Sequence, residues 1–179
     1  EPGLVISAAG PVAPATRIPK KGDDVEPGFL SILHPGSARI TLPPAALRST
    51  GRRTALAKWI TSPDNPLTSR GMVNRLWQQH FGRGLAANAS DFGKLGELPT
   101  HPELLDWLAA RFVADDWSLK KMHRLMVTSA TYRMRSEIQN PKSETLKPHL
   151  VDPENRLLWH YPISRLDAGQ IHDAALAAS

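Results

Sequence analysis

The side chains in this sequence that could do chemistry are polar residues at positions where a helical pattern expects apolar ones. Over 66–81, aliphatic and aromatic residues recur at helical spacing and predict a buried face, and Arg70, Asn74 and His80 fall on or beside it. A buried arginine must be paired, because an unpaired charge away from water is strongly unfavourable. Arg70 is therefore predicted either to form a structural ion pair with the following loop or to bind an anion at the edge of a pocket.

Further candidates lie downstream of this helix. Asp91 falls in a glycine-containing loop, and His101 precedes the next predicted helix. His123 and Arg133 fall inside the apolar face of a helix predicted over 118–133. Because these residues form no known motif, they are candidates for ligand binding, and the sequence assigns no catalytic residue.

The histidines do not show the spacing of a metal site. His80, His101 and His123 stand one to each of three predicted elements, and the sequence contains no H-E-x-x-H motif. Cysteine is absent, which excludes thiolate metal sites, disulfides and covalent c-type haem attachment within this chain. There is also no G-x-S-x-G nucleophile motif and no phosphate-binding glycine loop. The sequence therefore predicts no metal and no cofactor.

Charge alternates in sign along the chain. The net charge is +5, but 48–83 carries seven basic residues and one acidic, and 84–116 carries two basic and six acidic. Over 117–147 the balance returns to seven basic and two acidic. Segments of opposite sign can neutralise one another within a fold, whereas a nucleic-acid surface usually shows one basic stripe with aromatic residues. The pattern therefore disfavours nucleic-acid binding, and no apolar run is long enough to span a membrane.

Hydrophobic periodicity and capping residues predict a mainly α-helical fold. Asn65 suits an N-cap and Pro66 a first helical residue, and Ser118 suits the start of another helix. We expect a compact helical domain over 52–179, truncated at its C-terminus, with an irregular Pro/Gly-rich arm over 1–51 that contains short β pieces and packs on it. Helices are predicted near 52–60, 66–81, 102–114, 118–133, 152–159 and 164–177, and strands near 3–8 and 39–42.

Four stretches carry a resemblance to a known family. They are TALAKWITSPDNPLTSRGMVNRLWQQHFGRGL, ASDFGKLGELPTHPELLDWLAARF, DDWSLKKMHRLMVTSATYRMRS and DPENRLLWHYPISRLDAGQIHDAAL. In this order they resemble a planctomycete C-terminal domain of unknown function that accompanies planctomycete cytochrome-type modules in exported proteins. The resemblance implies a periplasmic or cell-surface location and partner domains in the same polypeptide, including a haem-bearing segment. It implies no catalytic residue, because none is established for the family.

Three classes of function remain open at this point. The first is a non-catalytic interaction or scaffold domain of a multidomain exported bacterial protein. The second is an enzyme or enzyme subdomain that acts on an extracellular polymer such as a glycan, and the third is a nucleic-acid binder. A deep pocket where Arg70, Asp91 and His101 meet would favour the enzyme, a flat apolar patch the scaffold, and a continuous positive stripe the nucleic-acid binder.

Overall fold

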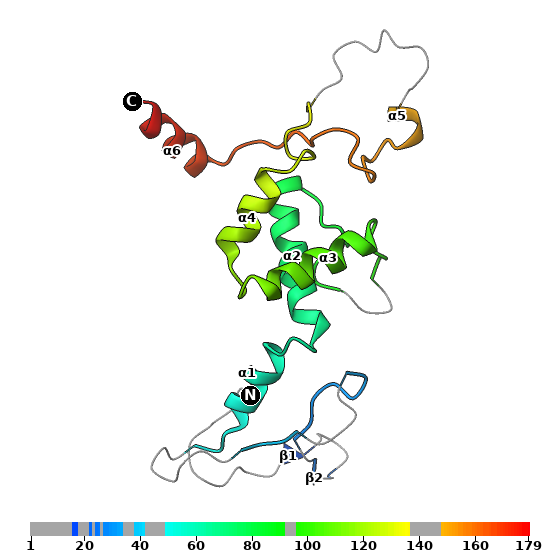
Figure 1. Ribbon diagram of the computed structural model, residues 1–179, viewed down its shortest axis with the longest axis vertical. Helices are drawn as coiled ribbons and strands as arrows, with labels where there is room; N and C mark the ends of the chain where they lie inside the picture. Colours follow the sequence, from blue (N-terminus) through cyan, green and yellow to red (C-terminus); the bar gives the residue numbers. More distant parts are fainter. Residues whose placement is uncertain are drawn as a thin grey trace. The chain divides into compact units, whose positions relative to one another are not determined.

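The computed structural model describes residues 16–17, 22, 24–25, 27–33, 38–41, 49–91, 96–136 and 148–179, and over these residues the fold is mainly α-helical (Figure 1). This confirms the predicted fold class, including its short β pieces. Contacts divide the chain into two units, 1–68 and 69–179. In chain order the elements are β1 (Thr16–Arg17), β2 (Asp24–Val25), α1 (Arg52–Ile60), α2 (Pro66–Phe81), α3 (Pro102–Ala114), α4 (Leu119–Val127), α5 (Pro148–Val151) and α6 (Ala168–Ala178).

The strands of the first unit form a small antiparallel pair. Thr16 lies opposite Val25 and Arg17 opposite Asp24. The Nε of Arg17 donates to Asp24 Oδ1 at 2.9 Å, and both side chains are exposed. The strand predicted over 3–8 lies outside the described residues, and the one predicted over 39–42 is not a strand at its described positions 39–41.

Aromatic stacking joins the N-terminal stretch of the first unit to α1. The rings of Phe29 and Trp59 are nearly parallel, with centroids 5.0 Å apart. Asn65 then fixes the end of α1 and the start of α2, because its Nδ2 donates to the Trp59 carbonyl at 3.2 Å and its Oδ1 accepts from the Leu67 amide at 3.1 Å. The predicted cap at Asn65 thus serves two helices at once.

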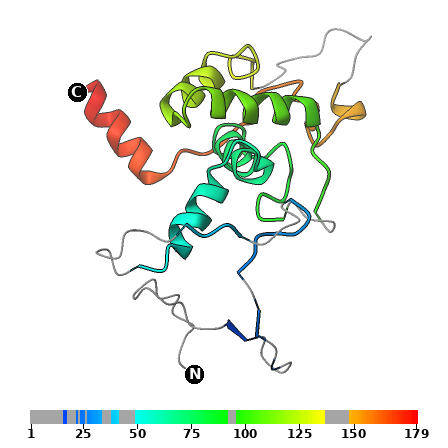
Figure 2. The same ribbon diagram turned by 60° about the horizontal axis from the view of Figure 1, so that its bottom comes forward.

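The core of the second unit lies where α2, α3 and α4 pack together (Figures 1 and 2). Each helix contributes the apolar face that its sequence periodicity predicts. Burying one large apolar side chain stabilises a fold by roughly 1.5–3 kcal/mol, so this cluster is the main source of stability for the unit. Its buried members are Val73, Leu76, Trp77, Phe81, Leu85, Leu105, Leu108, Phe112, Met122 and Met126.

A buried asparagine holds the turn after α2 against the helix. Asn74 has no exposed surface, its Nδ2 donates to the Ala86 carbonyl at 2.9 Å, and its Oδ1 accepts from the Ala86 amide at 2.9 Å. The close approach requires glycine at position 84, where a Cβ would lie 2.5 Å from the Ala86 oxygen and 2.7 Å from Asn74 Nδ2. The amide therefore satisfies a buried loop backbone that no helix or strand could pair.

Two helix boundaries differ from those predicted, and one predicted helix is not helical. α4 ends at Val127 rather than near 133, because the Thr128 hydroxyl turns back to the Arg124 carbonyl at 2.8 Å. α6 begins after Asp167 rather than Ser164, because Asp167 and Gln170 form the capping box. The helix predicted over 152–159 is a pair of turns, in which Asn155 and Leu158 have φ of 54° and 56°.

Gly84→Ala tests whether the turn needs its close approach. A methyl group there would press on backbone and on a fully buried amide, so we expect a loss of about 1–3 kcal/mol in the free energy of unfolding. Gly71→Ala is the matched control, since a Cβ at Gly71 inside α2 meets nothing within 4 Å. Alanine is the better helix former, and this variant should be up to about 1 kcal/mol more stable. Equal stability changes in urea denaturation would refute the packing argument.

Candidate functional site

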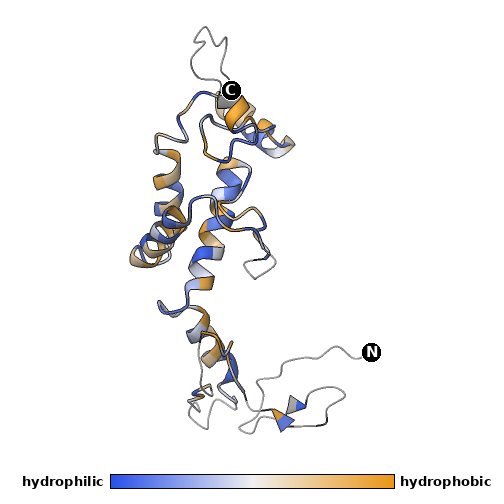
Figure 3. Cartoon of the chain, turned by 90° about the vertical axis from the view of Figure 1, so that its right-hand side faces the viewer, coloured by the Kyte–Doolittle hydropathy of each residue, from blue (hydrophilic) through white to orange (hydrophobic). Residues whose placement is uncertain are grey.

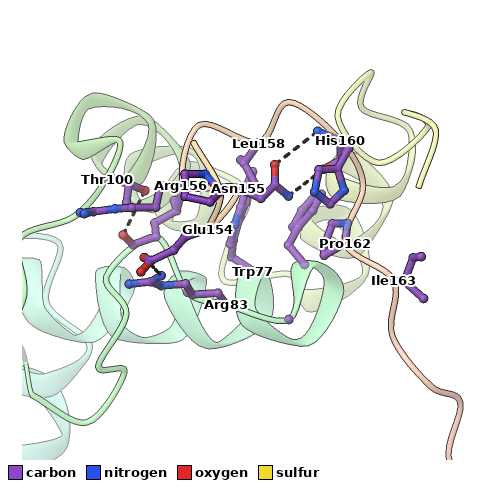
Figure 4. Close-up of a pocket in the computed structure, with 15 residues that line it drawn as sticks. Trp77, Arg83, Thr100, Glu154, Asn155, Arg156, Leu158, His160, Pro162 and Ile163 are labelled. Carbon is purple, nitrogen blue, oxygen red and sulfur yellow. Dashed lines mark hydrogen bonds and ion pairs between the residues drawn. The ribbon is translucent and has the colours of Figure 1, made fainter. Parts of the chain in front are cut away.

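A pocket of about 390 Å³ lies beside the C-terminal end of α2 (Figure 4). Its volume is at the lower end of the range for small-ligand sites in proteins. Buried apolar residues from α2 and the following turn form one part of its lining, and Thr100 and the turns over 153–163 supply the rest. The lining residues with polar or charged side chains that matter below are Arg83, Glu154, Asn155, Arg156 and His160.

Asp152 organises the turn that supplies much of this lining. It is 8% exposed and accepts the backbone N–H groups of Arg156 at 2.9 Å and Leu157 at 2.7 Å. These bonds, led by the one from Leu157, hold the pKa of the Asp152 carboxyl below its ordinary value, although burial acts in the opposite sense. The indole N–H of Trp159 donates to the Asp152 carbonyl at 2.9 Å. Asp152 is therefore committed to building the turn.

The side chain of Asn155 also forms hydrogen bonds to the backbone of this turn. Its Nδ2 donates to the His160 carbonyl at 2.9 Å, and its Oδ1 accepts from the His160 amide at 3.3 Å (Figure 4). The left-handed φ of Asn155 suits this short-range pairing, because asparagine tolerates that conformation better than most residues. The arrangement repeats the bonding of Asn74 with Ala86, so each amide uses one N–H donor and one oxygen lone pair on the backbone.

Arg83 lies between two carboxylates at the edge of the pocket. One terminal nitrogen of its guanidinium donates to Glu154 Oε2 and the other to Glu97 Oε2, each at 3.2 Å. The Arg83 side chain is 41% exposed and those of the glutamates are more so, which places each pair among surface ion pairs worth about 0–1 kcal/mol. Figure 4 shows the Glu154 carboxylate directed at Arg83.

Arg156 and His160 keep hydrogen-bonding capacity. The guanidinium of Arg156 has no hydrogen bond or ion pair in the part of the chain that the structure describes. The Nδ1 of His160 lies 3.0 Å from the Tyr161 carbonyl and must donate to it, so a neutral ring leaves Nε2 as an acceptor. In Figure 4 the two side chains lie on opposite sides of the Asn155 amide.

Two of the predicted candidates meet behind the pocket. His80 Nε2 and His123 Nδ1 are 2.8 Å apart, so one ring donates and the other accepts. The edge of Tyr132 packs on His80, and the Tyr161 hydroxyl donates to the His80 carbonyl at 2.8 Å. Burial and the charge that His123 can carry both lower the pKa of His80. Burial, followed by the neighbouring Tyr132, raises the pKa of Tyr161. The histidines thus complete a polar cluster at the edge of the core.

Arg70 forms an ion pair, as the first of the two alternatives predicted. Its Nε donates to Asp106 Oδ1 at 2.7 Å, with the two side chains 37% and 54% exposed. Arg70 is half-buried rather than buried, between the buried residues Ser69 and Val73 of α2. Asp106 belongs to α3 and not to the following loop, so the pair joins two helices at the surface. Arg133 is also exposed rather than on an apolar face, because α4 ends before it, and its Nε donates to the Ser129 carbonyl at 3.4 Å.

The remaining candidates lie apart from the pocket lining. His101 is the N-cap of α3, and its ring contacts the Thr100 hydroxyl at 3.0 Å. Asp91 is half-buried in its loop, where its amide donates to the Asn88 carbonyl at 3.2 Å. None of Arg70, Asp91 and His101 lines the pocket. Among the described residues there is also no group of three metal-binding side chains.

Sequence reasoning missed the polar residues that line the pocket. Arg83 stands between two glycines, which is the signal of a turn with an exposed side chain, but its acidic partners are distant in sequence. Glu154 and Arg156 fall in a dense polar run that was interpreted as a helix start. The turns of that run depend on positive φ values at Asn155 and Leu158, which no sequence pattern predicts here.

These features describe a helical domain with a mixed polar and apolar pocket beside α2. Residues 52–179 match the family PSD1, protein of unknown function (DUF1553), and the chain belongs to this family. No curated protein and no solved structure matches the chain. The resemblance to a domain of unknown function is thereby confirmed, while planctomycete origin and association with cytochrome modules stay predictions. No helix in the described part of the chain has the length and apolar character to cross a membrane.

The pair of histidines predicts a pH dependence of stability. A lowered pKa of His80 means that the folded state binds fewer protons than the unfolded chain, whose histidine pKa is 6.5. The contribution of His80 is therefore complete above that pH and is lost as the pH falls toward the folded-state pKa. We expect the urea midpoint to drop between about pH 7 and about pH 5.5. His80→Gln should flatten this slope, and His172→Gln, at an exposed histidine of α6, should not. Equal slopes in all three proteins would contradict the assignment.

Proposed function

We propose that this chain is a non-catalytic interaction domain of a multidomain exported bacterial protein. The observation that carries the proposal is that polar residues on the apolar faces of the helices converge on one another. His80 pairs with His123, and Asn74 with the backbone of Ala86. Export and a haem-bearing neighbouring domain rest on the resemblance described above.

Polar groups that are already saturated do not support catalysis. A general base or nucleophile needs a lone pair or proton that faces a substrate. The Asp152 carboxylate and the Asn155 amide line or shape the pocket, yet both are occupied by backbone groups. His80 and His123 use the facing nitrogens of their rings on each other. These four polar groups therefore build the fold, and Arg156 and His160 keep hydrogen-bonding capacity in the lining.

Ion pairs also account for much of the charge alternation along the chain. Arg70 on α2 pairs with Asp106 on α3, and Arg83 pairs with Glu97 in the acidic segment. Asp115 accepts from Arg111 at 2.8 Å and from Lys121 at 3.3 Å. Basic and acidic segments thus neutralise one another within the fold, which supports an interaction domain over a nucleic-acid binder.

The surface proposed for interaction is α6. This helix has 11 residues and a complete capping box, yet none of its residues is buried. Ile171 and Leu176 are 56% and 62% exposed, and Figure 3 shows the apolar character of the C-terminal helix. A helix of this length is marginal in water on its own, because most helical stability in proteins comes from packing an apolar face. α6 therefore suits packing on a neighbouring domain.

Hydrogen exchange tests this proposal on the isolated chain and on its natural polypeptide. Amides of α6 should exchange rapidly in the isolated chain and at least about tenfold more slowly when a partner domain covers the helix. Ile171→Glu should abolish that added protection, because it places a charge on the apolar face. Ala177→Glu adds the same charge on the face that carries Gln170 and Asp173, and protection should persist. Equal exchange of α6 in both contexts would overturn the proposal.

A further inference from the structure

We propose that the pocket beside α2 binds a small carboxylate, with the anionic group paired to Arg156 and an apolar body against Leu158 and Pro162. The lining residues include none from α6. This binding site is therefore separate from the proposed interaction surface, and either proposal can fail while the other stands.

Arg156 is the group that selects the charge of the ligand. Its backbone N–H is used by Asp152, but its guanidinium has no hydrogen-bond or ion-pair partner among the described residues. Guanidinium groups present a planar set of donors that matches the two oxygens of a carboxylate. The positive charge of Arg156 helps to lower the pKa of the Asp152 carboxyl. The oxygens of that carboxyl already accept two backbone N–H groups. A ligand carboxylate would supply the directed acceptors that Asp152 does not.

Glu154 gives an example of a carboxylate paired with an arginine within the pocket itself. Its carboxylate lies on the guanidinium of Arg83 at 3.2 Å, so one of the two arginines in the lining already holds a carboxylate. Both side chains are largely exposed, and such a pair exchanges easily for another partner. Arg83 is balanced by Glu154 and by Glu97, so among the described residues the unpaired charge in the lining is that of Arg156, which favours an anion over a cation.

The apolar part of the lining sets the size of the ligand body. Leu158, Pro162 and Ile163 are at least partly accessible, while Phe81 and Leu85 are buried behind them. A pocket of about 390 Å³ holds a group about as large as one aromatic side chain with a short linker. The C-terminal end of α2 faces the same pocket and carries partial negative charge, which opposes an anion and keeps affinity modest.

The test uses 3-phenylpropionate and its neutral amide, 3-phenylpropionamide, with the complete 179-residue chain. Two-dimensional amide NMR should show shifts at 154–163 for both probes, with the acid bound about three- to tenfold more tightly. Arg156→Gln should remove the preference for the acid and leave the affinity of the amide unchanged. Glu154→Gln should strengthen binding of the acid, because it removes a negative charge from the lining and leaves Arg83 with Glu97 as its one carboxylate partner among the described residues. Arg124→Gln, which removes an exposed arginine of α4 outside the pocket, should change neither affinity.

The proposal is overturned if neither probe shifts these amides, if acid and amide bind equally, or if the preference survives Arg156→Gln. A free small acid and the C-terminus of a protein chain share this chemistry. The peptide Ac-Gly-Gly-Phe and its C-terminal amide distinguish them. Tighter binding of the peptide acid than of 3-phenylpropionate would identify a chain terminus as the ligand, and weaker binding would identify a free small acid.

Discussion

The second unit depends on one buried amide. Asn74 stands in the middle of α2, and its two hydrogen bonds to Ala86 turn the chain back along the helix as soon as α2 ends. The turn brings Leu85 into the core and leaves Arg83 on the outside, where it meets Glu97 and Glu154. Because a buried amide with an unpaired group would be costly, the geometry tolerates little variation. Core packing and pocket position both follow from this pairing.

In the segment over 152–163, side chains likewise form hydrogen bonds to backbone groups that lie outside any helix or strand. Asn155 pairs with both backbone groups of His160, and Asp152 accepts the two amides that the turn would otherwise leave unpaired. An irregular segment can therefore pack on the end of α2 without a strand or a helix. Much of the polar chemistry around the pocket is therefore structural, and Arg156 and His160 keep hydrogen-bonding capacity in its lining.

The sequence predicts a helix well where residues within the helix and next to it mark its start and its end. The bounds of α1, α2 and α3 agree with those expected, since periodicity and the cap at Asn65 are local features. Asn74 and His80 were recognised as polar residues on an apolar face, and both are structural. The exposure of Arg70 could not be predicted, because it depends on how much of α2 is covered by α3. The pocket could not be predicted either, because its lining joins residues about seventy positions apart.

The hydroxyl of Tyr161 has a consequence for the order in which this unit assembles. Its bond to the His80 carbonyl closes a loop of 81 residues, whereas α2, α3 and α4 meet across much shorter separations. Closing a longer loop costs more chain entropy before any contact offsets it. During synthesis the three helices can thus collapse while one edge of Phe81 is still uncovered, and Tyr161 covers that edge only after the segment over 152–163 has left the ribosome. Until then, the nascent chain presents an aromatic surface to its surroundings.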